Sequence, residues 1–279
     1  MSLTETVETE LEVTDALIPD VPRRGRILRT ILAPVIGVVT FLGLWQLLVW
    51  VFDIPEYLLP APSQIFRHIF SDLGFYASNA RITLWEASLG FLIALALAVA
   101  AATVLAHNRF VEQASLPLVV LIQVTPIIAY APAIVIWLGF GLKPILVITA
   151  LVCFVPFLVN AVTGFRSIDP ATHELMRSVS ASRREVFFRL RVPHALPYLF
   201  SAGRIAVGLA LIGAVLGEFF AGVTGGLGYA VKVAQARSLT LQLWGSIYVL
   251  GFLGAVAVIL VSALERLVLR WHSSQSDAH

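Results

Sequence analysis

The chain has 279 residues, of which 58% are hydrophobic and only 13% charged, with a mean hydropathy of +0.89. This composition excludes an ordinary water-soluble domain, and the formal net charge of +2 is too small to indicate a nucleic-acid-binding protein. The single cysteine, Cys153, excludes an intramolecular disulfide. The composition instead indicates an all-α, polytopic membrane protein.

Residues 1–22 carry six acidic side chains and no basic one. Alternating Thr and Glu residues followed by Pro19 and Pro22 predict a disordered acidic tail. Four arginines follow between residues 23 and 29, so that 1–30 is predicted to comprise this tail and a basic juxtamembrane segment. Because arginine and lysine are enriched on the cytoplasmic side of membrane spans, we expect the N-terminus inside the cell.

Six apolar stretches approach the length of about 20 residues that a bilayer-spanning helix needs. They are residues 31–52, 87–106, 116–140, 145–165, 205–221 and 243–264. We therefore expect one transmembrane domain over 31–270 with about six helices, followed by a polar tail over 271–279. Basic residues are concentrated in the segments that this arrangement places inside, which predicts that both termini are cytoplasmic.

Polar residues and prolines within the spans are candidates for a solute pathway or gate. These are Gln123, Pro126 and Pro132 in the third stretch, Asn160 in the fourth, and Glu218 near the outer end of the fifth. Interior prolines free backbone carbonyls that must face protein or a water-lined cavity, and intramembrane acids generally face a bundle interior or pathway. Two alternatives stay open, because the prolines could simply kink a packing helix and Glu218 could lie at the water interface. The glycines after Glu218 lack a P-loop pattern and predict a tight re-entrant turn.

The 165–199 segment is a polar, basic island between two apolar stretches, and it holds six of the nineteen Lys and Arg residues. Asp169 is predicted to cap a first short helix, and the pair Ser182 and Glu185 forms a capping box for a second. Pro193 is expected to end that second helix. Phe187 and Leu190 share one of its faces and should face water in the isolated subunit, which favours docking to a partner.

The same segment resembles the EAA loop of ABC-importer permeases. That pattern has Glu-Ala-Ala, three residues, Gly, and a proline thirteen residues later. Glu174 matches the glutamate and Pro193 the proline, whereas Ser180 stands at the glycine and Leu175 and Met176 replace the alanines. The ATPase-coupling residues that this resemblance and the helix pattern imply are Glu174, Ser180, Ala181, Ser182, Phe187, Leu190 and Pro193.

Residues 31–270 further resemble the nitrate/sulfonate/taurine branch of these permeases. The segments that show this resemblance are residues 59–63, residues 79–91 at the entry to the second span, the proline-rich stretch 124–141 and the glycine-rich stretch 218–229. The resemblance implies the type I importer permease fold, a homodimer, two cytoplasmic ATPase subunits that bind ATP and Mg²⁺, and an external substrate-binding protein. It implies no cofactor on this chain and a small anionic or polar solute in the bacterial cell membrane, such as a sulfonate, nitrate, taurine or bicarbonate; the branch also includes importers of thiamine precursors and riboflavin.

The alternative class is an ion-coupled secondary transporter. Such a transporter would need paired intramembrane charges and an internal repeat, whereas the sequence offers only Glu86 and Glu218 and no clear repeat. A membrane-embedded enzyme is disfavoured because no catalytic constellation, Walker A motif or paired metal-ligand spacing is present. We therefore expect no catalytic or metal-binding residue, and co-purification with an ATPase subunit would separate the first class from the other two.

Overall fold

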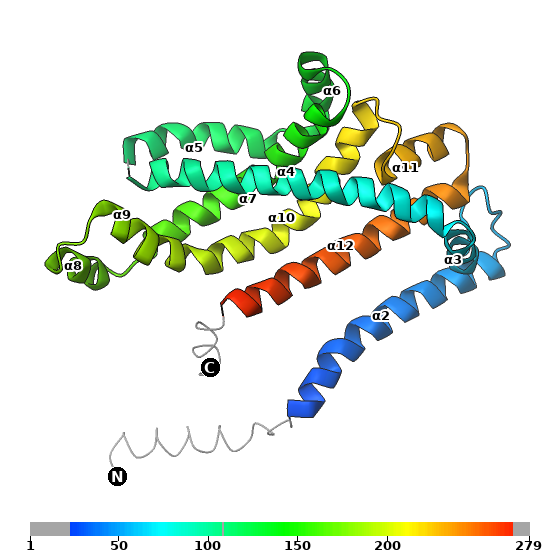
Figure 1. Cartoon of the computed structure of the whole chain (residues 1–279). Helices are drawn as coiled ribbons and strands as arrows, with labels where there is room; N and C mark the ends of the chain where they lie inside the picture. Colours follow the sequence, from blue (N-terminus) through cyan, green and yellow to red (C-terminus); the bar gives the residue numbers. More distant parts are fainter. Residues whose placement is uncertain (1–22, 108, 270–279) are drawn as a thin grey trace, which may run out of the picture. The chain divides into compact units, whose positions relative to one another are not determined.

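The computed structural model describes residues 23–107 and 109–269, and all regular secondary structure in these ranges is helical (Figure 1). The acidic tail expected over 1–22 and the polar tail expected over 271–279 lie outside the described residues. Within these described ranges, five helices are long and apolar enough to cross a membrane, and a bent pair raises the number to six if it forms one span. The prediction of an all-α membrane domain of about six helices is confirmed.

The described residues divide into two compact units. The first contains α2 (Arg23–Val51), an apolar helix with one internal proline, Pro34. Because α2 begins at Arg23, the basic segment expected before the first span is the opening turns of the helix itself. Large side chains of this helix are exposed, including Phe41 and Trp50, as expected of a helix that faces lipid or other protein.

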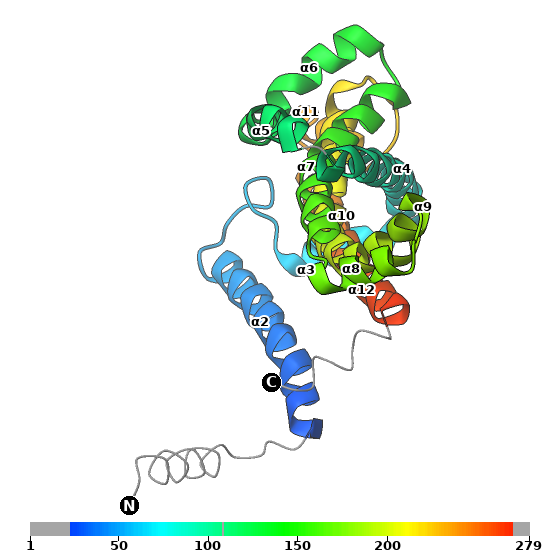
Figure 2. The same cartoon turned by 90° about the vertical axis from the view of Figure 1, so that its left-hand side faces the viewer.

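The second unit holds nearly all of the remaining chain. Its helices are α3 (Pro62–Ser71), α4 (Leu73–His107), α5 (Arg109–Val124), α6 (Ile127–Leu138), α7 (Leu142–Arg166), α8 (Pro170–Ser178), α9 (Arg183–Val186), the π-helical turn η1 (Phe187–Arg191), α10 (Val192–Phe220), α11 (Leu227–Ala236) and α12 (Thr240–Val268). The helices α4, α7 and α10 pack against one another (Figure 2). Helix α12 packs on α10 and α11. This three-helix core holds the loops at both ends of the second unit in place.

Small side chains allow α4, α7 and α10 to approach closely. The core is largely alanine, with Ala98, Ala161 and Ala206 fully buried. A Cβ atom added to Gly213 of α10 would lie 2.6 Å from the Thr149 Cα of α7, so the two backbones are in contact there. In lipid, helices are held together by van der Waals packing rather than by a hydrophobic driving force, and small residues permit the closest packing.

The third predicted span is not a single helix. Helices α5 and α6 meet at Thr125 and Pro126 with a bend of 99°. Pro126 has an extended ψ of 126° and carries no backbone N–H, so it cannot continue α5. The apolar stretch predicted over 116–140 is therefore two helices, and Pro126 breaks the helix between them.

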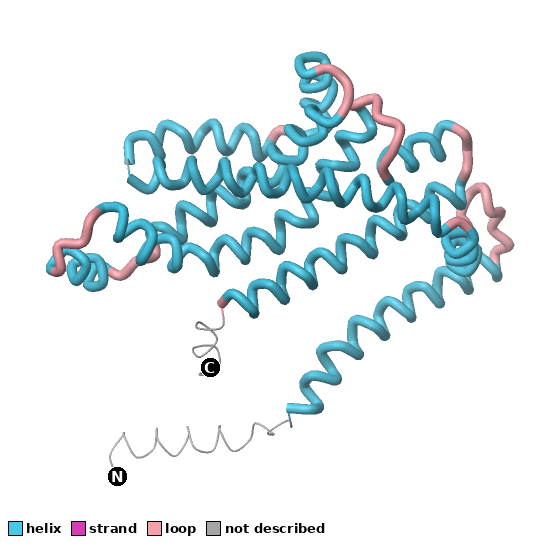
Figure 3. The backbone as a smooth tube through the Cα atoms, viewed as in Figure 1, coloured by secondary structure: helices cyan, strands magenta, loops and turns pink. Residues whose placement is uncertain are grey.

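The two ends of the second unit differ in their loops. Helices α8 and α9 lie at one end, whereas α11 and the turn before it lie at the opposite end (Figures 1 and 3). The predicted tight turn after Glu218 is present, with positive φ at Gly222 and Gly226. Helix α11, which follows this turn, was not expected from the sequence.

Candidate functional site

The turn between α8 and α9 has the backbone geometry that the EAA glycine would provide. Ser180 adopts a left-handed conformation with φ of +55°. The Ala181 N–H donates to the Met176 carbonyl oxygen at 3.0 Å, which is the six-to-one bond of a Schellman C-cap. A side chain is unfavourable in this conformation, so Ser180 holds the turn at a cost that glycine would avoid.

Both predicted caps of the loop helices are confirmed. Asp169 Oδ1 accepts from the Ala171 N–H at 3.4 Å, at the start of α8. Ser182 Oγ accepts from the Glu185 N–H at 3.3 Å, and Glu185 Oε2 accepts from the Ser182 N–H at 3.0 Å, which closes the capping box before α9. These are local signals, and the loop helices begin where the sequence places them.

The expectation that Pro193 ends the second loop helix is wrong. The chain stays helical from α9 through η1 into α10. In η1 the Val192 N–H donates to the Phe187 carbonyl oxygen five residues earlier, so the turn is wider than an α-helical turn. A widened turn accommodates a proline that lacks a donor and would otherwise crowd the carbonyl four residues before it. The loop helix is thereby continuous with a transmembrane helix.

The widened turn also changes which side chains face water. Leu190 is only 6% exposed, and the half-buried Phe187 contacts Phe165 of α7 with ring centroids 5.7 Å apart. The expectation that these two side chains face water is therefore wrong. Phe188 is the exposed aromatic residue, at 59%, and the Arg184 guanidinium lies 5.9 Å from its ring centroid.

Other residues assigned to coupling lie on the loop surface. Glu174, Ser180 and Ser182 are exposed, whereas Ala181 and Pro193 are half-buried. The loop also exposes two large apolar side chains on and just after α8 that the sequence analysis did not single out, Leu175 at 63% and Val179 at 66%. We name Leu175, Val179 and Phe188 the exposed loop residues.

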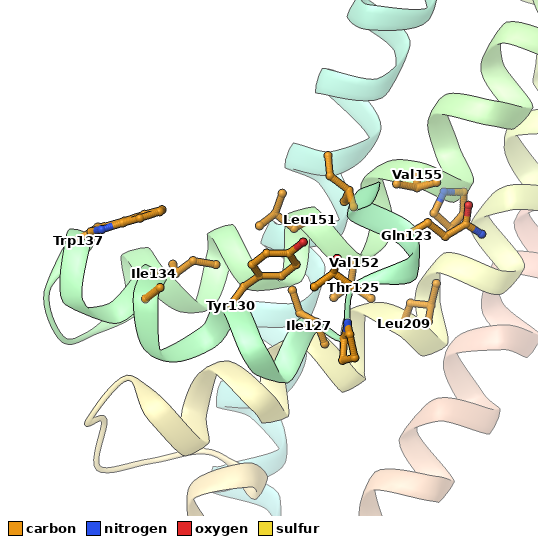
Figure 4. A pocket seen from close by; sticks show the side chains of 14 residues that line it. Gln123, Thr125, Ile127, Tyr130, Ile134, Trp137, Leu151, Val152, Val155 and Leu209 are labelled. Carbon is orange, nitrogen blue, oxygen red and sulfur yellow. The ribbon is translucent and has the colours of Figure 1, made fainter. Parts of the chain in front are cut away.

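A hollow of about 560 Å³ brings together residues of α5, α6, α7 and α10 (Figure 4). Of the predicted pathway residues, Gln123 and Pro126 line it, whereas Pro132, Asn160 and Glu218 do not. Tyr130 and Trp137 are aromatic lining residues that were not predicted. None of the described residues that line this hollow carries a charge. Apart from a few polar groups, including the Gln123 amide and the Tyr130 hydroxyl, its wall is apolar.

Glu218 is fully buried at the N-terminus of α11. Its Oε2 atom accepts from the N–H groups of Gly228 at 2.5 Å and Tyr229 at 3.2 Å, and its Oε1 atom accepts from Thr83 Oγ1 at 2.7 Å. The water-interface alternative for Glu218 is thereby wrong, and a role as a gate stays a prediction.

Two side chains of α4 complete this capping arrangement. Asn79 Oδ1 accepts from the Gly226 N–H at 2.9 Å, and Thr83 Oγ1 accepts from the Leu227 N–H at 2.8 Å. Together with Glu218 they bind four consecutive backbone N–H groups that have no partner within α11 itself. The Glu218 carboxylate also lies at the positive end of the helix dipole. Asn79, Thr83 and Glu218 are the capping residues of α11.

A family model described as a binding-protein-dependent transport system inner membrane component matches residues 90–273, more than half of the chain. The chain belongs to this family. It is 32% identical to the formylaminopyrimidine transport permease protein ThiX of Halalkalibacterium halodurans, over 88% of this chain and 97% of the relative. It is 34% identical to the riboflavin transport system permease protein RibX of Chloroflexus aurantiacus, over 82% of this chain and 86% of the relative.

More distant relatives include the taurine transport system permease protein TauC of Escherichia coli, which is 27% identical over 77% of this chain and 80% of the relative. The fold matches a chain in the crystal structure of an amino acid ABC transporter with histidines, with a TM-score of 0.56 and 16% identity. That match covers 74% of this chain and 97% of the other. The permease is therefore a non-enzymatic, multi-pass subunit of an ABC importer, and the secondary-transporter alternative is wrong.

Proposed function

We propose that two copies of this permease form a translocation pathway in the bacterial cell membrane. Two cytoplasmic ATPase subunits, which bind ATP and Mg²⁺, dock on the 165–199 segment, and an external binding protein delivers the solute. The observation that supports this proposal most directly is the unbroken helix from α9 through η1 into α10. A force applied to the loop is transmitted to a transmembrane helix without a flexible joint.

The exposed loop residues are suited to docking. Leu175, Val179 and Phe188 present apolar surface beside the exposed cations Arg184 and Arg189. Each such side chain contributes roughly 1.5–3 kcal/mol when a partner buries it. ATP binding to the partner subunits moves the docked loop and changes which side of the pathway is open, provided that the loop contacts differ between the two states.

The topology of this proposal has a direct test. Both termini and the 165–199 segment are cytoplasmic, and the α11 end is external. A reporter fused after Arg191 should therefore indicate a cytoplasmic position. A reporter fused after Val233 should indicate an external position. The opposite result for either fusion would contradict the proposed orientation.

The chemistry of the 560 Å³ hollow favours a neutral, planar nitrogen heterocycle as the solute. An anion entering an uncharged wall loses its hydration without gaining a partner, which is costly. A heterocycle can stack on Tyr130 or Trp137 and exchange hydrogen bonds with the Gln123 amide. Similarity to permeases named for formylaminopyrimidine and riboflavin supports the same class.

A small sulfonate or similar anion is the second candidate, because the taurine and sulfonate permeases are also relatives. Competition for uptake in cells that carry the complete importer separates the two. We expect a pyrimidine or flavin to compete and taurine or nitrate not to compete. Tyr130→Ala and Gln123→Ala should each weaken uptake about tenfold, which corresponds to the loss of one good contact. Ile136→Ala, on the same helix as Tyr130 but outside the hollow, serves as the matched control.

A further inference from the structure

A second hollow lies beside the capping residues of α11. It has a volume of about 490 Å³ and is formed by the first half of α4, the turn between α6 and α7, and the glycine turn after α10. Glu86 of α4 lines it, although only 5% of this residue is exposed. The other lining residues are uncharged: Ile82, Phe140, Gly141, Gly222, Val223, Thr224 and Gly225.

Glu86 lies beside Glu218, because Thr83, one turn earlier on α4, donates to Glu218 and the two carboxyl groups are close enough to interact. Glu218 already accepts hydrogen bonds from Thr83 and from two backbone N–H groups, so its surroundings suit an ionised carboxylate. Glu86 is placed differently, because its buried Oε2 atom receives no hydrogen bond from the described residues. A buried, ionised carboxylate oxygen without a donor is costly, and the cost is lower when the carboxyl group carries a proton.

Among the described residues, no positive charge is found to pair with Glu86. On α4, the neighbouring polar groups Asn79 and Thr83 are neutral, and α11 contributes backbone N–H groups to Glu218 only. The cation Lys232 of α11 donates to the Phe219 carbonyl oxygen. Glu218 is the one charged group found to interact with Glu86 among the described residues.

We propose that Glu86 is a proton-binding site that faces the outer hollow and joins α4 to the Glu218 cap of α11. Water in the hollow delivers the proton to a Glu86 carboxylate oxygen, and the neutral acid donates it as a hydrogen bond to Glu218. Release of the proton to that water leaves two carboxylates side by side at low dielectric, which repel each other. The proton therefore closes the contact between α4 and the glycine turn, and its loss opens that contact.

Infrared spectroscopy of the complete importer in detergent gives a direct test. At neutral pH the wild-type protein should show the carbonyl band of a protonated, buried carboxylic acid, and this band should shift in D₂O because the hollow admits water. Glu86→Gln should remove the band, whereas Glu56→Gln, which changes an exposed acid bonded to Gln64, should leave it. Absence of the band from the wild-type protein would overturn the proposal without any variant.

Thermal unfolding at a series of pH values gives a second readout. An unfolded chain holds Glu86 ionised above about pH 4.3. If the folded chain keeps the proton, folding takes up a proton and stability falls as pH rises, by about 3–5 °C per pH unit for a chain of this size. Glu86→Gln keeps the shape of the side chain and a hydrogen-bond donor, and it should remove this contribution to the slope. An unchanged slope in Glu86→Gln, or a slope set by sodium or potassium concentration rather than pH, would overturn the proposal.

Discussion

The α8–η1 loop and the α11 turn sit at opposite ends of the second unit and are stabilised in opposite ways. The loop is capped by neighbours within a few residues, as in the Ser182 and Glu185 box, and exposes large apolar side chains such as Phe188. At the α11 turn, the key capping hydrogen bonds join residues that are separated by 135 to 147 positions in the sequence. The acid at the centre of this turn, Glu218, is fully buried. The loop end leaves surface for another protein, whereas the α11 end is completed within the chain. Substitutions should therefore impair partner binding at the first end and folding at the second.

Removing the central acid of the α11 end should have the largest effect. Glu218→Ala leaves the buried N–H groups of Gly228 and Tyr229 without an acceptor and removes the cap of α11. We expect a loss of about 2–4 kcal/mol in the free energy of unfolding, measured by thermal or denaturant unfolding of the solubilised permease. Glu218→Gln keeps one acceptor oxygen and should lose about half as much. A Glu218→Ala variant that is as stable as wild type but inactive in transport would instead favour a gate.

At the loop end, the double variant Leu175→Ala with Phe188→Ala should weaken binding of the ATPase subunit and leave the permease folded. Each exposed side chain removes roughly 1.5–3 kcal/mol of docking energy, so pull-down of the ATPase subunit should fall at least tenfold. The free energy of unfolding should change by less than about 0.5 kcal/mol per site, because more than half of each side chain is exposed.

The adjacent residue on η1 provides the matched control. Phe187 packs on Phe165 rather than facing water, so Phe187→Ala should destabilise the permease by up to about 3 kcal/mol. If the single variant at Phe187 abolished docking without destabilisation, and the double variant left docking intact, the face we assign to the partner would be the wrong one.

This contrast also shows how far the sequence could predict the structure. The apolar spans and both loop caps depend on signals within a few residues, and they were found close to their predicted positions. The exposed face of the second loop helix was misjudged by one residue, because an α-helical period placed Phe187 outward and the π turn at η1 places Phe188 there instead. A wide turn of this kind has no reliable sequence signature, although Pro193 is a pointer to it.

The α11 end could be predicted only in part. Glu218 and the tight glycine turn were identified, yet Asn79 and Thr83, which complete the cap, were missed. The sequence did contain a signal for these residues. Asn79 and Thr83 are four residues apart, Thr83 and Glu86 are three apart, and the three side chains form one polar stripe on an apolar helix. What they bind lies more than a hundred residues away, and helix periodicity carries no information on such distant partners.

The smallest expected effect concerns Ser180, where the loop departs from the EAA pattern. A left-handed conformation is unfavourable for a residue with a Cβ atom, whereas glycine adopts it freely but loses more chain entropy on folding. The balance should make Ser180→Gly more stable by about 0.5–1 kcal/mol, measured by thermal unfolding and by slower hydrogen exchange of the Ala181 N–H.

Ser178→Gly, two residues earlier and still within α8, should have the opposite sign, because glycine is unfavourable inside a helix. Since both variants remove the same side chain, opposite signs would isolate the backbone conformation as the cause, and equal destabilisation by the two would show that the turn at Ser180 is not left-handed. Stabilisation without a gain in ATPase pull-down would further show that the turn sets the local structure of the loop while the exposed loop residues supply the docking energy.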